Sequence, residues 1–225
     1  MFAHLSRYRR VLAPWMMMVL SVPVAWAANN GAPLSSSFPG PLWDVVAPAG
    51  GTAAVADAHL TLTVPGGSNH DPMRPSNEAV RVVQPINDSN FDVSIKIDSA
   101  ISAHNADTSQ GLMVLADSHN FLTLDVDTNG TNISLAVHAI KNGVSTTVFD
   151  QAVFSEYHNP LCLRIARNGD TYVAYYSVDG VVWTEATSFV NSIVPTQIGP
   201  FAGNYNSAPA KAVPVVMAIN WFDVL

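Results

Sequence analysis

The sequence predicts an all-β protein whose antiparallel sheets pack as a sandwich. About twelve segments with strand character follow one another, and turn-forming residues separate them at short intervals, as in sandwiches and barrels. Asn-Gly or Asp-Gly pairs begin at Asn129, Asn142, Asn168 and Asp179, and such pairs favour the turns that join neighbouring antiparallel strands. No segment has the apolar spacing of a convincing amphipathic helix.

The N-terminal segment has the pattern of a secretory signal. A cluster of arginines between residues 7 and 10 precedes an apolar run over residues 11–27, which ends in an Ala-x-Ala cleavage pattern. A membrane anchor is the alternative, but prolines interrupt the run, and about 17 residues are short for a membrane span. We therefore expect a signal peptide at 1–27, a linker or extended lead-in at 28–41, and a secreted or periplasmic protein.

The rest of the chain has the composition of one domain, which we expect over residues 42–225. The chain has 225 residues, 48% of them hydrophobic, and this is enough for a substantial core. Its formal net charge of −7 argues against nucleic acid as a partner, and against an anionic membrane once the signal is cleaved. Cys162 is the only cysteine, so no internal disulfide is available. Its place within a strand indicates a buried structural thiol.

Alternation of apolar and polar residues places the strands along the chain. Residues 90–99 alternate most cleanly, with Phe91, Val93 and Ile95 on one face. The strands that flank them in the sequence are expected at 43–46, 53–64, 78–84, 110–116, 120–127, 132–140, 144–149, 197–203 and 213–225. The last strand can pair near the first, so both ends of the domain would be held in the sheets.

Residues 161–183 are predicted to form the central meander of a sheet with one core face and one outward face. If Asn168-Gly169 is the two-residue loop of the first hairpin, Ile165 faces Tyr172 and Arg164 lies opposite Val173. The predicted core face consists of Leu161, Leu163, Ile165, Tyr172 and Tyr176. Arg164 and Tyr175 point outward, so that face is the first place to look for function.

The longest stretch without a strand or helix pattern covers residues 65–77, with the sequence PGGSNHDPMRPSN. Turn-forming residues alternate there with His70, Asp71, Arg74 and Asn77. Long loops in compact domains are often functional, and a solvated connection is the alternative interpretation.

Several stretches carry a resemblance to a known family. They are PGGSNHD, NEAVRVVQPINDSNFDVSIKID, QGLMVLADSHNFLTLDV, LRIARNGDTYVAYYSVDGVVW and IGPFAGN. Together they resemble the concanavalin A-like lectin/glucanase superfamily, and more closely its DUF1349-type secreted bacterial domains, which are related to the C-terminal sandwich of family 43 β-xylosidases. The resemblance covers residues 42–225 and implies a jelly roll of two curved antiparallel sheets with carbohydrate bound on the concave face. Pro72-Met73 stands where relatives often carry an aromatic residue.

Carbohydrate binding needs aromatic faces for stacking and planar polar groups for hydroxyls. The predicted ligand-binding residues are Arg81, Gln110, Asp125, His138, Arg164, Tyr175 and Trp183, and Asn204 and Tyr205 are further residues of a suitable type. On a solvated concave face, Arg81 would join Arg164 and Tyr175, with Asp125 as its partner. Core or sheet packing is the alternative role for Trp183.

Asp125 and Asp127 are two residues apart, on one face of a predicted strand. Paired carboxylates on a concave sheet are the machinery of glycoside hydrolysis. Hydrolytic members of the superfamily carry E-x-D-x-x-E or E-x-D-x-E patterns on such a strand, whereas the glutamates of this chain lie elsewhere, at positions 78, 156 and 185. We therefore predict no catalytic residues.

No metal site and no cofactor are predicted. Histidines and aspartates recur at His70-Asp71, Asp117-x-His119 and Asp125-x-Asp127, but no string of ligands matches a calcium-binding loop. A structural calcium ion near Asp127 and Asn129 is the open alternative. Zinc is disfavoured because no cluster of His and Cys has a suitable spacing.

The leading hypothesis is a secreted, non-catalytic β-sandwich that binds an extracellular oligosaccharide or polysaccharide through its concave face. One alternative is a glycoside hydrolase or polysaccharide lyase that acts on extracellular glycan. Another is a structural or adhesive protein of the cell envelope. Exposed aromatic rings beside Arg or Asn on a concave face would favour the first, and a flat apolar patch without a cleft would favour the last.

Overall fold

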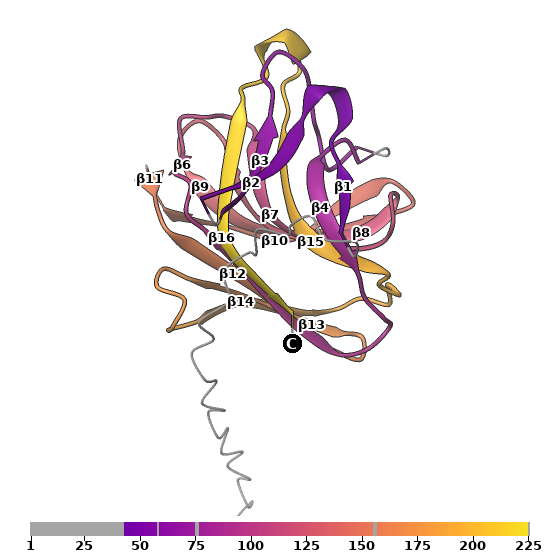
Figure 1. Cartoon of the computed structure of the whole chain (residues 1–225). Coiled ribbons are helices and arrows are strands. Elements are labelled where there is room, and N and C mark those ends of the chain that lie inside the picture. Colours follow the sequence, from indigo (N-terminus) through magenta and orange to yellow (C-terminus); the bar gives the residue numbers. More distant parts are fainter. Residues whose placement is uncertain (1–42, 58, 75–76, 155–156, 225) are drawn as a thin grey trace, which may run out of the picture.

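The alternating strands fold into two seven-stranded antiparallel sheets that form the two layers of a sandwich (Figure 1). A computed structural model describes residues 43–57, 59–74, 77–154 and 157–224. The predicted signal peptide and lead-in lie outside the described residues, so both stay predictions.

Sheet A holds the strands that later carry the candidate site. Its spatial order is β1-β4-β15-β7-β8-β9-β10. The bounds of these strands are β1 Asp44–Val46, β4 Val80–Pro85, β15 Gln197–Asn204, β7 Thr108–Asp117, β8 Asn120–Thr128, β9 Ile133–Lys141 and β10 Val144–Phe154. The run from β7 to β10 is a meander of hairpins, and the turn pairs at Asn129 and Asn142 lie between its strands, as the sequence predicts.

Sheet B has the order β14-β13-β12-β5-β16-β3-β2. Its strands are β14 Thr184–Val190, β13 Thr171–Ser177, β12 Leu161–Asn168, β5 Phe91–Ile97, β16 Val215–Val224, β3 His59–Val64 and β2 Thr52–Ala56. The C-terminal strand β16 pairs with β3 and β5 inside this sheet. The C-terminal end of the domain is therefore held by hydrogen bonds on both sides.

Short elements complete the described chain. Strands β6 (Ile101–Ser102) and β11 (Tyr157–His158) pair with each other. Two three-residue 3₁₀ turns, η1 (Pro48–Gly50) and η2 (Pro209–Lys211), interrupt the loops. Within the described ranges, no helix has the length and apolar character needed to cross a bilayer.

The core lies between the two sheets and takes alternate residues from each strand. Leu122, Leu124 and Val126 of β8 face Leu163 and Ile165 of β12 across this layer, and all five side chains are buried. Burial of this apolar surface is the main force that holds the sheets together. The second face of each strand remains available for other roles.

The outer face of sheet A carries a second, smaller apolar cluster. Its buried members are Ala79, Val83, Met113, Leu115, Phe121, Ile140 and Phe201, and Met73 of the loop over residues 65–77 packs on it. Polar side chains, among them Thr123 and Asp125, lie elsewhere on this face beside small residues such as Gly111 and Ala136. The loop is thus anchored over one part of sheet A and borders the polar part.

The first hairpin of the predicted central meander has a different register from the expected one. Arg164 pairs with Tyr175 and Ile165 pairs with Ala174, so the loop is Gly169-Asp170 rather than Asn168-Gly169. The shift is two residues, and a shift by an even number leaves every side chain on its predicted face. Leu163, Ile165 and Tyr172 are buried in the core, as expected, and Cys162 is a buried free thiol.

Gly111 is expected to be essential for the close approach of β7 and β8. A Cβ atom at this position would lie 2.2 Å from the carbonyl oxygen of Leu124 and 2.6 Å from the Cα of Asp125. Both are backbone atoms of a central strand, so Gly111→Ala should lower the free energy of unfolding by about 3 kcal/mol, as overpacking does. Urea denaturation measures this loss.

The control is Gly169→Ala, at a glycine with a φ of 58° and no atom within 4 Å of the added Cβ. Only the left-handed backbone opposes this change, so it should lower the free energy of unfolding by about 1 kcal/mol. A Gly111→Ala variant as stable as Gly169→Ala would contradict the steric argument.

A polar cluster on the inner strands β3 and β5 of sheet B should make stability depend on pH. His59 Nε2 lies 3.1 Å from Asp98 Oδ2, and Lys96 Nζ lies 3.0 Å from Asp98 Oδ1. The hydrogen bond to Asp98 raises the pKa of His59. Burial acts to raise the pKa of Asp98, but hydrogen bonds from Lys96 and His59 outweigh it and lower that pKa.

Protonated His59 adds to the free energy of unfolding below its unfolded pKa of about 6.5. This stabilisation disappears as the pH rises through its higher folded pKa. Ionised Asp98 stabilises the fold above about pH 3.9, and this stabilisation disappears as the pH falls through its lower folded pKa. Asp98→Asn should therefore destabilise the protein more at about pH 5.5 than at pH 9, by less than about 1 kcal/mol because the pair is partly solvated. Urea denaturation of the variant and the wild type at both pH values tests this. In a His59→Gln background, Asp98→Asn should lower the free energy of unfolding equally at the two pH values. If the loss is also equal in the wild-type background, the linkage between His59 and Asp98 is disproved.

Candidate functional site

The outer face of sheet A brings together two carboxylates and an imidazole. Asp125 and Asp127 alternate with core residues of β8, and His138 alternates with core residues of β9. The register pairs Asp125 with Ala136 and Thr123 with His138. His138 is therefore diagonal to Asp125, within reach of its carboxylate.

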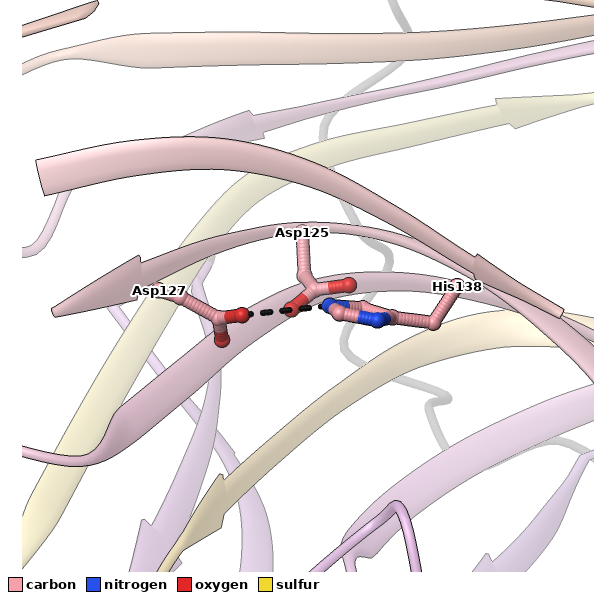
Figure 2. A group of neighbouring side chains, drawn as sticks. All are labelled: Asp125, Asp127 and His138. Atoms are coloured by element: carbon pink, nitrogen blue, oxygen red, sulfur yellow. Dashed lines mark hydrogen bonds and ion pairs between the residues drawn. The ribbon is translucent and has the colours of Figure 1, made fainter. Parts of the chain in front are cut away.

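Small neighbours make room for this group. On one side Asp125 pairs with Gly111 of β7, and on the other it pairs with Ala136 of β9. Neither neighbour has a side chain that extends beyond Cβ, so the imidazole of His138 can lie across the strand. In Figure 2 the strands arch over Asp125, Asp127 and His138, which places the three side chains on the concave side of sheet A.

Direct contacts hold the three side chains in place. His138 Nε2 lies 3.3 Å from Asp127 Oδ2, as the dashed line in Figure 2 marks. Ser109 Oγ donates a hydrogen bond of 2.7 Å to Asp125 Oδ2. On the other side of the ring, His138 Nδ1 lies 3.4 Å from Thr147 Oγ1 of β10. The group thus spans four adjacent strands, β7 to β10.

Burial and charge perturb the titration of this group. Burial raises the pKa of Asp125 well above its ordinary value, and the negative charge of Asp127 raises it further, against the opposing effect of His138. Burial lowers the pKa of His138, but the hydrogen bond to Asp127 and the surrounding carboxylates outweigh it and raise that pKa to about 9. A pKa above neutrality favours the protonated imidazole, which can pair with the Asp127 carboxylate. Strongly perturbed groups of this kind are typical of functional sites.

Asp127 and His138 also line a pocket of about 390 Å³. Its wall comes from the loop at residues 65–77, the start of β7, the end of β8, β9, β10 and the segment after β15. The lining residues are Asp71, Pro72, Met73, Asp107, Thr108, Ser109, Asp127, Thr128, Asn129, Ser134, His138, Asp150, Asn204 and Tyr205. Its volume lies in the range of small-molecule sites, about 300–1,000 Å³.

Buried polar contacts fix the loop at residues 65–77 against β15. His70 and Asn204 exchange two backbone hydrogen bonds, of 3.0 and 3.2 Å. Asn204 Nδ2 also donates to the carbonyl oxygens of Pro65 and Val213, at 3.0 and 2.6 Å. Asp71, Pro72 and Met73 follow directly and form one wall of the pocket. The loop that the sequence marked as unusual is therefore part of the candidate site.

The predicted residues Asp125 and His138 do meet, but two other predicted residues of sheet A have different surroundings. Arg81 Nη1 donates to the carbonyl oxygens of Asn77 and Ala79, at 2.9 and 3.2 Å, so it anchors the end of the loop. Gln110 pairs with Val126 and Ala202, so it lies on the core side of the sheet and is 5% exposed. The expected partnership of Arg81 with Asp125 is therefore wrong, and Gln110 does not belong to the outer face.

The remaining predicted residues lie on the other sheet. Arg164, Tyr175 and Trp183 gather on the outer face of sheet B, with the Arg164 guanidinium 5.1 and 5.7 Å from the two ring centroids. Arg164 is 7% exposed, and its Nε donates to Asp92 Oδ1 at 2.7 Å while its Nη2 forms an ion pair with the same carboxylate. The expectation that Arg81 joins Arg164 and Tyr175 is wrong because the core separates them. The contacts of Arg164 are those of a structural residue.

Sequence reasoning did not select several residues that line the pocket. The sequence offers Tyr205 only as a residue type suited to sugar binding. Its side chain is 37% exposed, and the guanidinium carbon of Arg74 lies 5.5 Å from its ring centroid. Asp150 lies in a strand whose sequence has no functional signal. Ser109 was missed because its role depends on a hydrogen bond across strands. For these residues the only available signals were the unusual loop and the Asp125-x-Asp127 pair.

Comparisons with solved structures agree on the fold. The GH43 protein BlXynB of Bacillus licheniformis superposes with a TM-score of 0.69 at 18% identity, over 89% of this chain and 40% of that protein, so this chain spans well under half of its length. A functionally unknown protein from Saccharomyces cerevisiae gives 0.61 at 13% identity, over 81% and 94% of the two chains. The carbohydrate-binding module CBM66 from Bacillus subtilis gives 0.53 at 16% identity, over 81% and 94%.

No curated protein is significantly similar to the chain in sequence. The family comparison is more specific than the structural ones, which at these identities show the fold alone. Residues 52–224 match the beta xylosidase C-terminal concanavalin A-like domain, and this match includes every strand of the two sheets except β1. The chain therefore belongs to the family of β-xylosidase C-terminal concanavalin A-like domains.

Proposed function

We propose that the protein binds an uncharged oligosaccharide, without cleaving it, in the pocket on the outer face of sheet A. One observation carries this proposal: the pocket combines an exposed aromatic ring, Tyr205, with planar carboxylate and amide groups from Asp127, Asp150 and Asn129. Sugars are bound in this way, by stacking on a ring face while planar polar groups take the hydroxyls. The N-terminal sequence supports an extracellular or periplasmic location for this binding.

The related proteins are compatible with such a role. One structural neighbour is named as a carbohydrate-binding module, and another is a GH43 protein that contains a domain of the same fold. A shared fold does not by itself carry a function, so the proposal rests on the pocket.

The charge of the pocket favours uncharged sugars over uronic acids. Arg74 Nε lies 3.4 Å from Asp71 Oδ2, and His138 forms an ion pair with Asp127, so both cations are already offset by carboxylates. Asp107 and Asp150 add further negative charge to the lining. A glycan carboxylate would meet repulsion here, because like charges at short distance disfavour binding.

Binding should depend on Tyr205 and not on the tyrosine of the other sheet. Tyr205→Ala should weaken the affinity for a neutral oligosaccharide about tenfold, the loss expected for one stacking contact of about 1.4 kcal/mol. Tyr175→Ala, the matched control on sheet B, should leave the affinity unchanged. A glycan array of neutral oligosaccharides, polygalacturonate and alginate identifies a ligand, and isothermal titration calorimetry then compares the variants.

The proposal fails if the wild type binds no neutral glycan, or if both tyrosine variants bind as the wild type does. Preferential binding of polygalacturonate or alginate would contradict the charge argument. The Tyr205→Ala variant would then still test whether the ligand binds in this pocket. Arg164→Ala is a poor choice for this experiment, because removal of one partner of a buried ion pair destabilises a protein by about 3–5 kcal/mol.

The protein should release no new reducing ends and no unsaturated uronates from a panel of neutral and acidic polysaccharides. Asp125, one of the two neighbouring carboxylates, has no exposed surface, so it offers no atom to a glycosidic bond. Assays of reducing sugar and of ultraviolet absorbance over a day measure both activities. Turnover that Asp127→Asn or Asp150→Asn abolishes would overturn the non-catalytic assignment.

A further inference from the structure

We propose that Asp125, Asp127 and His138 bind one divalent transition-metal ion, of the class that includes Zn²⁺ and Mn²⁺. The proposal concerns the ion alone and does not require the pocket to bind a sugar. It rests on the geometry of the three side chains, on one buried oxygen atom and on the groups that support the ligands.

The geometry fits a single ion. One ligand atom from each of Asp125, Asp127 and His138 lies within 4.8 Å of the other two. Ligand atoms that lie about 2.0–2.2 Å from one metal ion are at most about 4.4 Å apart, so the three side chains need only a small shift to converge on one ion. The three residues project from two adjacent, fully paired strands, β8 and β9, so the backbone holds them in a rigid arrangement.

A buried oxygen atom of Asp125 points to a ligand. Asp125 is 0% exposed, and Ser109 satisfies its Oδ2, whereas its Oδ1 has no partner of good hydrogen-bond geometry among the described residues. The side chains of Thr123 and Asp127 lie near enough to the Asp125 carboxyl to interact with it more weakly. A buried carboxylate oxygen without a partner is costly, and proteins normally pair such a group or coordinate it to a metal. A proton on Asp125 is the alternative occupant, and the experiment below separates the two.

Supporting groups orient the ligands as they do at metal sites. Ser109 Oγ holds Asp125 from one side at 2.7 Å. Thr147 Oγ1 lies 3.4 Å from His138 Nδ1, so Nε2 is the ring nitrogen that faces the carboxylates. Metal-binding histidines usually have a second partner of this kind on the other nitrogen, and ligating carboxylates are themselves hydrogen-bonded.

The ligand types select the class of ion. Calcium and magnesium prefer shells made of oxygen alone, whereas an imidazole beside carboxylates suits zinc, manganese and iron. Asp127 and His138 line the open pocket, so an ion there has access from solvent and space for water at its remaining positions. The ion would bind the carboxylates and the imidazole in their deprotonated forms, as is general for metal sites.

The test uses the purified protein without a polyhistidine tag, treated with EDTA and then dialysed. Titration calorimetry with ZnCl₂ or MnCl₂ should give one ion per chain. Thermal unfolding should shift upward by about 5 °C or more when the free ion is at about one hundred times its dissociation constant. Asp127→Asn and His138→Gln should each weaken binding more than about tenfold, because each replaces a carboxylate or imidazole ligand with a weaker neutral amide.

The matched controls are Asp117→Asn and His119→Gln, which alter an exposed Asp-x-His pair at the turn between β7 and β8. They should bind the ion as the wild type does. Unfolding of each metal-free variant shows whether it is folded, and if one ligand variant does not fold, the other decides. The proposal is overturned if neither Zn²⁺ nor Mn²⁺ binds at millimolar concentration, if both ligand variants bind like the wild type, or if Ca²⁺ binds more tightly than either ion.

Discussion

The packing of sheet A against sheet B is the interaction on which the rest of the structure depends. It uses alternate residues of almost every strand, and the buried side chains of Leu124, Leu163 and Ile95 are typical of it. Because no disulfide is present, this apolar layer must hold the fold together. It also determines where function can lie, since each central strand has only its outer face left for polar groups. The two outer faces differ in the polar groups that they carry and in how far these groups are exposed.

The outer face of sheet B is stabilised by a charged and aromatic cluster. Arg164 bonds to Asp92 through two nitrogen atoms, and its guanidinium lies over the rings of Tyr175 and Trp183. Arginine suits this position because its planar group can bind a carboxylate and stack on rings at the same time. The guanidinium is almost fully buried by these partners, so little of it is available to a ligand.

The outer face of sheet A combines an apolar cluster with polar groups that are costly to bury. Asp125 has no solvent contact, and this requires the small neighbours Gly111 and Ala136 and the hydroxyl of Ser109. Such an arrangement gives little stability by itself, because desolvation opposes ionisation of the carboxylate. Residues of this kind are expected where a site is more important than stability. The adjacent loop, fixed through Asn204, turns the polar area into a pocket.

The sequence by itself determined the fold class, most strand positions and the faces of the central meander. These follow from period-two alternation and from turn residues, which are local properties. The faces are right although the predicted register of the hairpin at Gly169 differs by two residues, because an even shift keeps each side chain on its face. Asp125 and His138 were selected from the sequence because their residue types suit a site, and the structure places them side by side. Only the tertiary structure decided which strands are neighbours, and therefore that Asp127 meets His138, that Tyr205 reaches the pocket and that Arg164 lies on the other side of the core. The physical reason is that sheet order and register depend on contacts between distant segments, and local patterns carry no information about them.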